Sequence, residues 1–123
     1  MRCLDSNIIA YAFYENESRA GCQELIKEGG IINTLNLNEA YNIIQYSTNR
    51  NHATNAIKSL LKSNIKIVNT DINLIFEVLK RTKKYEKLKF LDLIHYITAV
   101  LNNFNEIASH DTDFDDLDLK RIA

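Results

Sequence analysis

Short apolar segments alternate along this sequence with longer segments of helical periodicity, and this alternation limits the folds that the chain can form. Residues 2–4, 30–34, 65–68, 106–109 and 120–122 are predicted to be strands. Strands of a few residues that alternate with helices are typical of a parallel sheet with helices on its faces. Because these strands are continuously apolar, we expect them to be buried on both sides. The predicted fold class is α/β, with a mostly parallel central sheet of about four or five short strands between layers of helices.

The predicted helices carry recognisable start and stop signals. The cluster Asp5-Ser6-Asn7 precedes apolar residues at helical spacing, and the helix over residues 18–28 is expected to end at a glycine pair. Further helices are expected at residues 36–44, 51–62 and 91–104, the last of them buried because it is apolar on most sides. We expect Asn36 to cap the first of these three. Asp71 is expected to cap a long amphipathic helix whose inward side chains are Ile72, Ile75, Phe76 and Leu79.

Composition excludes several other classes of protein. The chain has 123 residues, of which 46% are hydrophobic and 25% charged, as in a soluble globular domain, and we expect one domain over residues 1–123. A net charge of -1 gives no overall attraction to nucleic acid, so a polyanion would have to bind to a local patch or a metal. The two cysteines have no C-x-x-C spacing, and no apolar stretch approaches the ~18 residues that span a membrane. The acidic residue within the N-terminal apolar run is unlike a secretory signal, so we expect a cytoplasmic protein with no membrane partner.

Acidic residues follow the predicted strands or begin the helices beside them. The residues that share this placement are Asp5, Glu39, Asp92, Asp111 and Asp113. In an open parallel sheet the residues beyond the carboxyl ends of the strands meet at one edge, where ligands bind. Carboxylates that gather without lysine or arginine repel one another, and a hard divalent cation such as Mg²⁺ or Mn²⁺ relieves the repulsion. The sequence therefore predicts a metal site suited to hydrolysis of phosphodiester bonds, in which the metal activates water and stabilises the leaving oxygen.

Three of these carboxylates also have an ordinary structural explanation. Asp5 fits a helix N-cap, and Asp92 fits an acid in the first turn of a helix, where the helix dipole favours it. Glu39 has the spacing of a capping box with Asn36. His95, one turn beyond Asp92, is interpreted as a core histidine, and the predicted chemistry requires no histidine.

The segment at residues 80–89 is the one basic patch of the sequence. As the solvated end of a helix, where basic side chains favour the dipole, it requires no function. Because it precedes Asp92, it is also a candidate surface for RNA phosphates. The residues that would contact RNA are Lys80, Arg81, Lys83 and Lys84.

The segments that carry the acids resemble the successive acidic motifs of the PIN-domain ribonucleases. They read L-D-S-N-I-I-A-Y at residues 4–11, L-N-E-A at 37–40, L-D-L-I-H-Y-I-T-A-V at 91–100 and I-A-S-H-D-T-D-F-D at 107–115. Within that family the chain is similar in size to the toxins of VapBC-type toxin–antitoxin pairs. The resemblance implies a PIN-like, Rossmann-like sheet, a Mg²⁺- or Mn²⁺-dependent endoribonuclease site, a homodimer and a small antitoxin partner.

By position, the residues that match the metal-binding acids of the family are Asp5, Glu39, Asp92 and Asp111, with Asp113 at a more variable acidic position. Ser6 and Asn7 match the polar residues of the first turn, and Ser109 the small hydroxyl position before the last motif. The chain departs from the family in having no proline. The leading hypothesis is an endoribonuclease toxin of a type II toxin–antitoxin system. The alternatives are a housekeeping PIN nuclease that processes ribosomal or other RNA and a non-catalytic PIN scaffold.

Overall fold

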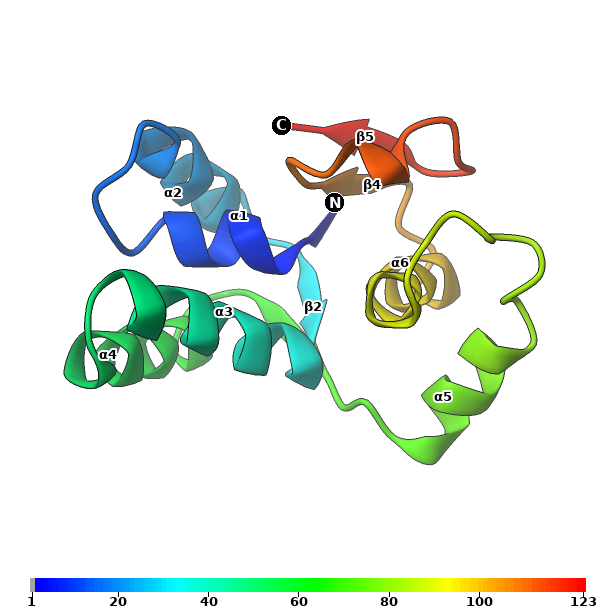
Figure 1. The fold of residues 1–123 in the computed structure, drawn as a ribbon, viewed down its shortest axis with the longest axis horizontal. Helices are drawn as coiled ribbons and strands as arrows, with labels where there is room; N and C mark the ends of the chain where they lie inside the picture. Colours follow the sequence, from blue (N-terminus) through cyan, green and yellow to red (C-terminus); the bar gives the residue numbers. More distant parts are fainter. Residues whose placement is uncertain (1) are drawn as a thin grey trace.

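A computed structural model describes residues 2–123 and shows a five-stranded parallel sheet covered by helices on both faces (Figure 1). The strands lie in the order β3-β2-β1-β4-β5, and every neighbouring pair is parallel. The α/β class and the parallel sheet of short strands are therefore confirmed. The elements are β1 (Arg2–Leu4), α1 (Ser6–Tyr11), α2 (Arg19–Glu28), β2 (Ile31–Asn33), α3 (Thr34–Ser47), α4 (Arg50–Leu61), β3 (Lys66–Val68), α5 (Ile72–Leu79), α6 (Phe90–Leu101), β4 (Glu106–Ala108), the short 3₁₀ helix η1 (Thr112–Phe114) and β5 (Lys120–Ile122).

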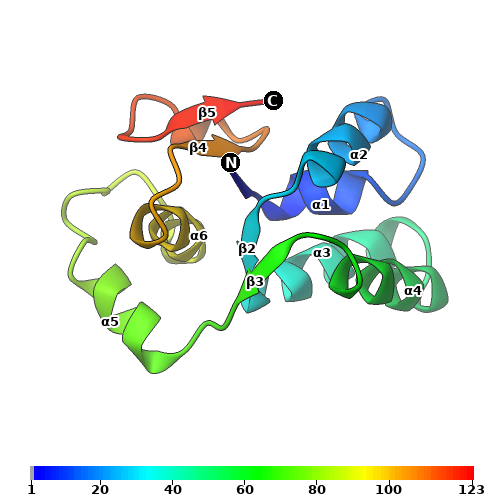
Figure 2. The same ribbon diagram turned by 180° about the vertical axis from the view of Figure 1, so that it is seen from behind.

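Consecutive residues of the inner strands enter two different cores. Ile31 of β2 packs in the core that includes α5 and α6, whereas the next residue, Ile32, packs in the core that includes α1 to α4. Ile107 and Ala108 of β4 divide in the same way. Figure 2 shows these two groups of helices on opposite sides of the sheet. The inner strands are continuously apolar because both of their faces are covered.

The strand order reverses between β1 and β4, the two central strands of the sheet. From β1 the chain proceeds through β2 to β3 on one side, and it then returns to form β4 and β5 on the other side. The connections that leave β1 and β4 therefore run in opposite directions. Open α/β sheets bind ligands at the carboxyl ends of the strands where the order reverses in this way. Leu4 pairs with Ala108, so Asp5 and Ser109 are the first residues beyond these strands.

The helix α3 begins earlier than predicted. Its N-cap is Asn33, whose side-chain oxygen accepts hydrogen bonds from the backbone N–H groups of Leu35 and Asn36. The Asn36 side chain in turn accepts from the backbone N–H of Asn33, which completes a capping box. Asn33 also ends β2, and its extended backbone is the conformation that an N-cap requires. The predictions that Asn36 caps this helix and that Glu39 forms a capping box with it are therefore wrong.

The helix after Asp71 is shorter than predicted, and a different side of it faces the core. Asp71 does cap α5, because its side chain accepts a hydrogen bond from the N–H of Leu74. The core is reached by Leu74 and Val78, with Ile75 partly buried against it. The other side chains predicted to face inward are exposed, with exposed fractions of 74%, 60% and 51% for Ile72, Phe76 and Leu79. This eight-residue helix is apolar on most sides, so periodicity alone does not determine which side is buried.

The predicted buried helix is confirmed as α6. Its residues from Leu93 to Ala99 are all buried. It ends at Leu101, before the predicted end at residue 104, because Asn103 has a positive φ of 61° that leaves the right-handed helix. Leu101 is exposed rather than buried. Within residues 2–123, no helix combines the length and the apolar character needed to cross a membrane.

Gly30 and Gly21 provide a test of how closely the segment before β2 approaches the backbone of β1. A Cβ atom on Gly30 would lie 2.6 Å from the backbone oxygen of Arg2, whereas one on Gly21 of α2 would meet nothing within 4 Å. We expect Gly30→Ala to lower the free energy of unfolding by about 1–3 kcal/mol, because the backbone has to shift. Gly21→Ala is expected to raise it by about 0.5–1 kcal/mol through helix propensity. Urea denaturation measures the free energy of unfolding of both variants. Equal stabilities would contradict the close approach of Gly30 to the backbone of Arg2.

Candidate active site

Asp5 lies at the carboxyl end of the central strand and is held by hydrogen bonds on both oxygens. Its Oδ1 accepts from the N–H of Ser6 at 2.8 Å, so it caps α1, and its Oδ2 accepts from the Ser109 hydroxyl at 2.6 Å. Ser109 Oγ also accepts from the backbone N–H of Asp111 at 3.0 Å. Ser109 therefore connects the acid after β1 with the acid after β4.

Glu39 reaches the same end of the sheet from the second turn of α3. Its Oε1 accepts a hydrogen bond from the Ser6 hydroxyl at 2.6 Å, and the same oxygen lies 2.5 Å from Nε2 of His95 on α6. Burial raises the pKa of Glu39, but the hydrogen bonds from His95 and Ser6 outweigh this effect and hold the pKa below its ordinary value. Glu39 is therefore held as a carboxylate between α1 and α6.

Asp92 lies in the first turn of α6 and is affected by the charges of the other acids. Partial burial raises its pKa to about 6, and the charges of Asp5, Asp111 and Glu39 contribute to the rise. Burial also raises the pKa of Asp5, where hydrogen bonds from Ser109 and Ser6 oppose the effect. Carboxylates from four separate segments of the chain are thus close enough to influence one another's ionisation.

No lysine or arginine within residues 2–123 forms an ion pair with these four acids. The contact of His95 with Glu39 is a hydrogen bond, which becomes an ion pair only if the ring is protonated. Oxygen ligands without neutralising cations are the donor set that Mg²⁺ and Mn²⁺ prefer, so the residues suit such an ion. In the described part of the chain, however, no three His, Cys, Asp or Glu side chains are grouped closely enough to hold a metal. Internal hydrogen bonds hold the side chains of Asp5, Glu39 and Asp111 in place.

Asp113 and Asn7 are less closely connected to the four acids than the other predicted site residues are. Asp111 Oδ1 accepts from the N–H of Asp113 and caps η1, while the Asp113 side chain itself is exposed. Asn7, in the first turn of α1, has a buried side-chain oxygen with no hydrogen-bond partner among the described residues. Ser6 and Ser109, by contrast, each donate to one of the acids.

Comparison with known proteins identifies the family. A family model described as the PIN domain matches residues 2–120. The chain belongs to the PIN domain family. The predicted resemblance is therefore confirmed, and the acidic cluster lies within the matched region.

One solved structure with the same fold is the crystal structure of Mycobacterium tuberculosis VapC20, described as a sarcin-ricin loop cleaving toxin. The two folds superpose with a TM-score of 0.77 over 90% of each chain, at 11% sequence identity. At this identity the similarity concerns the fold alone. No curated protein matches the chain.

The basic segment of this PIN domain is not the end of a helix. Helix α5 ends at Leu79, and residues 80–89 form a series of turns. Lys80 and Arg81 pair with Glu77, and Lys84 pairs with Asp118 at 3.2 Å. Among the four cations predicted to contact RNA, only Lys83 forms no ion pair within residues 2–123.

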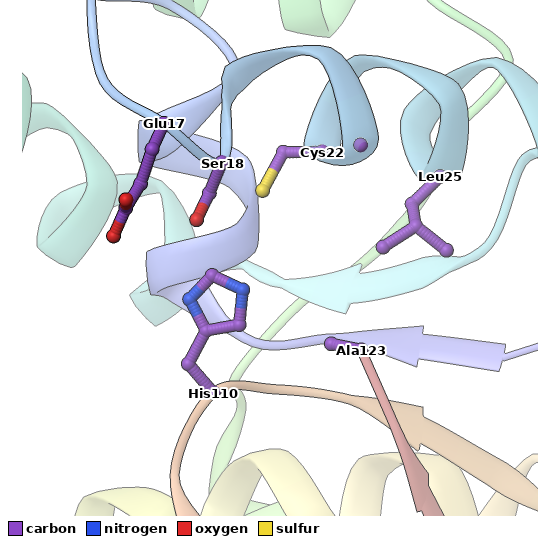
Figure 3. A pocket seen from close by; sticks show the side chains of 7 residues that line it. Glu17, Ser18, Cys22, Leu25, His110 and Ala123 are labelled. Atoms are coloured by element: carbon purple, nitrogen blue, oxygen red, sulfur yellow. The ribbon is translucent and has the colours of Figure 1, made fainter.

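A small pocket lies on the other side of the loop that carries Asp111. Figure 3 shows His110 on this loop facing Ser18 and Cys22 of the α2 region, with Glu17 and Leu25 nearby. The His110 ring also packs against the ring of Tyr11, with centroids 5.5 Å apart. None of the four clustered acids lines this pocket.

Sequence reasoning missed the roles of Asn33 and His95 at this site. His95 is fully buried, as expected of a core histidine, but it contacts a site carboxylate through Nε2 and Asn33 through Nδ1. Its position one turn after Asp92, on the helix that carries an acidic motif, was the available signal. Asn33 gave no signal of its own, because it was assigned to the interior of a strand.

The raised pKa of Asp92 predicts how stability depends on pH. The Asp92 carboxyl stays protonated up to about pH 6 in the folded state, whereas it loses its proton near pH 4 in the unfolded state. Ionisation of Asp92 therefore lowers the stability of the metal-free fold progressively from about pH 4 to pH 6, and the full penalty is present above pH 6. Asp92→Asn removes the penalty. We expect its melting temperature in EDTA to exceed that of the wild type by a few degrees at pH 7–8, and the advantage to disappear near pH 4.

Asp113→Asn is the matched control, because Asp113 is exposed and is not among the charges that raise the pKa of Asp92. Its melting temperature is expected to follow that of the wild type across the pH range. An Asp92→Asn variant with no advantage above pH 6 would show that the carboxylates are not coupled.

Proposed function

We propose that this PIN domain is a divalent-metal-dependent endoribonuclease and the toxin of a type II toxin–antitoxin pair. The observation that carries the proposal is the cluster of four coupled carboxylates at the carboxyl end of the sheet, which no lysine or arginine among residues 2–123 neutralises. RNA is the proposed substrate because the chain belongs to the PIN domain family and shares the fold of a protein described as a sarcin-ricin loop cleaving toxin. A small antitoxin is the proposed protein partner, and the cytoplasm, where RNA substrates occur, is the proposed location.

The residues proposed to hold Mg²⁺ or Mn²⁺ are Asp5, Glu39, Asp92 and Asp111, with Asp113 as an additional ligand. When bound, such an ion supplies activation of water and stabilisation of negative charge at the phosphate. The chain itself positions the ligands: Ser109 orients Asp5, and Ser6 and His95 orient Glu39. The buried Asn7 oxygen is a further acceptor next to the first turn of α1.

The segment at residues 80–89 is proposed to bind RNA phosphates. Lys83 has no ion pair to exchange within the described residues, whereas Lys80, Arg81 and Lys84 would exchange carboxylate partners for phosphate. Ion pairs between exposed side chains contribute little to stability, so this exchange requires little energy.

Replacing Asp5 tests the proposed activity. Asp5→Asn keeps the helix cap, because asparagine caps as well as aspartate, but removes a proposed metal ligand. We expect RNA cleavage in Mn²⁺ to fall by about 100-fold or more, as loss of several kcal/mol of transition-state stabilisation implies, with an unchanged circular-dichroism spectrum. Induced expression of the wild type is expected to arrest cell growth, whereas expression of Asp5→Asn is expected to leave growth unchanged. This growth assay distinguishes a toxin from a housekeeping nuclease.

The matched control is Asp116→Asn, an exposed acid whose positive φ asparagine tolerates, and it is expected to keep full activity. EDTA and a DNA oligonucleotide of the same sequence control for metal dependence and for substrate class. Wild-type protein that leaves RNA intact in Mn²⁺, or Asp5→Asn that remains active, would contradict the proposal.

We also propose a homodimer that uses the exposed apolar face of α5, formed by Ile72, Phe76 and Leu79. These residues follow one another at helical spacing, and large apolar side chains that gather on a surface mark interaction sites. Phe76→Glu is expected to convert the dimer to a monomer in light scattering. The control is Leu61→Glu, because Leu61 of α4 is similarly exposed, at 56%, but lies in the other helical layer. A monomeric wild type would contradict the proposed dimer.

A further inference from the structure

A continuous network of hydrogen bonds connects the start of α3 with Glu39. Its first chain begins at the Asn33 side chain, whose Nδ2 lies 2.8 Å from Nδ1 of His95, and continues from His95 Nε2 to Glu39 Oε1. Its second chain begins at Asn36, whose Nδ2 donates to Ser6 Oγ at 2.9 Å, and continues from the Ser6 hydroxyl to the same Glu39 oxygen. Asn33 and Asn36 are the two members of the α3 capping box. The two chains therefore start at one local structure and end at one atom.

The capping box determines which end of the Asn33 amide faces His95. Asn33 Oδ1 accepts from the backbone N–H groups of Leu35 and Asn36, so it occupies the acceptor position. The opposite end, Nδ2, approaches His95 and also Thr98, whose hydroxyl already donates to the carbonyl oxygen of Ile94. The hydrogen bonds on both ends of this amide are consistent with one orientation, in which Nδ2 faces His95. An amide nitrogen donates hydrogen bonds and does not accept them.

The orientation of Asn33 in turn determines where His95 carries its proton. Because Asn33 Nδ2 donates, His95 Nδ1 must accept and carries no hydrogen. The proton of the neutral ring is then on Nε2, which faces Glu39 Oε1. Asn33, His95 and Thr98 are fully buried, so water does not compete for these bonds.

The two chains of hydrogen bonds end on the same Glu39 oxygen, so the two carboxylate oxygens differ in their hydrogen bonding. Oε1 receives hydrogen bonds from both His95 and Ser6, whereas Oε2 has no hydrogen-bond partner among residues 2–123. A carboxylate held through one oxygen presents the other in a fixed direction. Donors behind a metal ligand fix its orientation in this way, and their loss typically weakens metal binding or activity by about 10–100-fold.

We propose that His95 is a positioning residue of this PIN domain: held by Asn33 as the Nε2–H tautomer, it donates to Glu39 Oε1 and thereby presents Oε2 to the divalent metal. This inference rests on the proposed function, because it concerns the same metal site. It adds a role for a buried histidine and traces that role to the cap of a neighbouring helix.

The first test is the position of the His95 proton in the metal-free protein at neutral pH. Protonated and unprotonated ring nitrogens give well-separated ¹⁵N resonances, and those of His95 are assigned by their loss in His95→Gln. We expect Nε2 to be protonated and Nδ1 to be unprotonated. In Asn33→Asp both side-chain oxygens accept, so the cap is kept while the donor to Nδ1 is lost, and we expect Nδ1 to become protonated. A wild-type ring protonated on Nδ1, or resonances unchanged in Asn33→Asp, would overturn the proposal.

The second test compares two replacements of His95 by Mn²⁺ binding, measured from the electron paramagnetic resonance of free Mn²⁺. In His95→Gln the amide oxygen can accept from Asn33 and the amide nitrogen can donate to Glu39, so we expect the Mn²⁺ dissociation constant to stay within about 3-fold of the wild-type value. His95→Leu fills a similar volume but offers neither a donor to Glu39 nor an acceptor to Asn33, and we expect it to bind Mn²⁺ about 10–100-fold more weakly. The dissociation constants are compared between variants that are folded by circular dichroism, because a purely structural role would lower the stability of His95→Leu and leave the Mn²⁺ affinity of its folded state unchanged.

The outcomes distinguish this inference from the proposed function. A wild type that binds no Mn²⁺ and cleaves no RNA overturns the proposed function and the role of His95 with it. A wild type that binds Mn²⁺ and cleaves RNA, with His95→Leu binding as tightly, overturns the role of His95 alone. Rescue by glutamine together with the Nε2–H tautomer supports it.

Discussion

Mutual repulsion of carboxylates at one end of the sheet is the constraint that organises this part of the molecule. The chain offsets it with hydrogen bonds rather than with cations: Ser109 donates to Asp5, and Ser6 and His95 donate to Glu39. The offset is incomplete, because Asp92 still has a pKa of about 6. Groups whose ionisation is perturbed by burial and by one another are typical of functional sites. The arrangement is unfavourable for folding, and the binding of a divalent cation is the simplest way to relieve it.

The junction between β2 and α3 has two roles in this arrangement. Asn33 and Asn36 satisfy backbone groups that the start of a helix leaves unpaired, which is the ordinary role of a capping box. Their remaining side-chain donors extend to His95 and Ser6 and, through these, to Glu39. A local folding signal thus sets the direction of hydrogen bonds at a site formed by distant parts of the chain.

Much of the fold and the approximate location of the site could be predicted from the sequence. Short apolar strands that alternate with helices favour a parallel sheet, and a parallel sheet brings the residues after β1 and β4 to one edge, so the placement of Asp5 and Asp111 at that edge follows from the topology. The orientation of α5 was not predictable, because a short helix that is apolar on most sides has no unique inward face. The contact between His95 and Glu39 was not predictable either, since it joins helices on opposite faces of the sheet. Such contacts depend on three-dimensional packing rather than on spacing along the chain.

The central position of β1 has a consequence for biosynthesis. This first strand pairs with β4, so Arg2 lies beside Glu106, and Ser109 is fixed in turn by a backbone hydrogen bond to Ile122. Contacts between residues so distant along the chain form late, because the intervening polypeptide must first emerge from the ribosome and be ordered. A nascent chain that has not reached Ser109 lacks the hydroxyl that donates to Asp5. The carboxylate cluster therefore becomes complete only once β4 and β5 are in place beside β1.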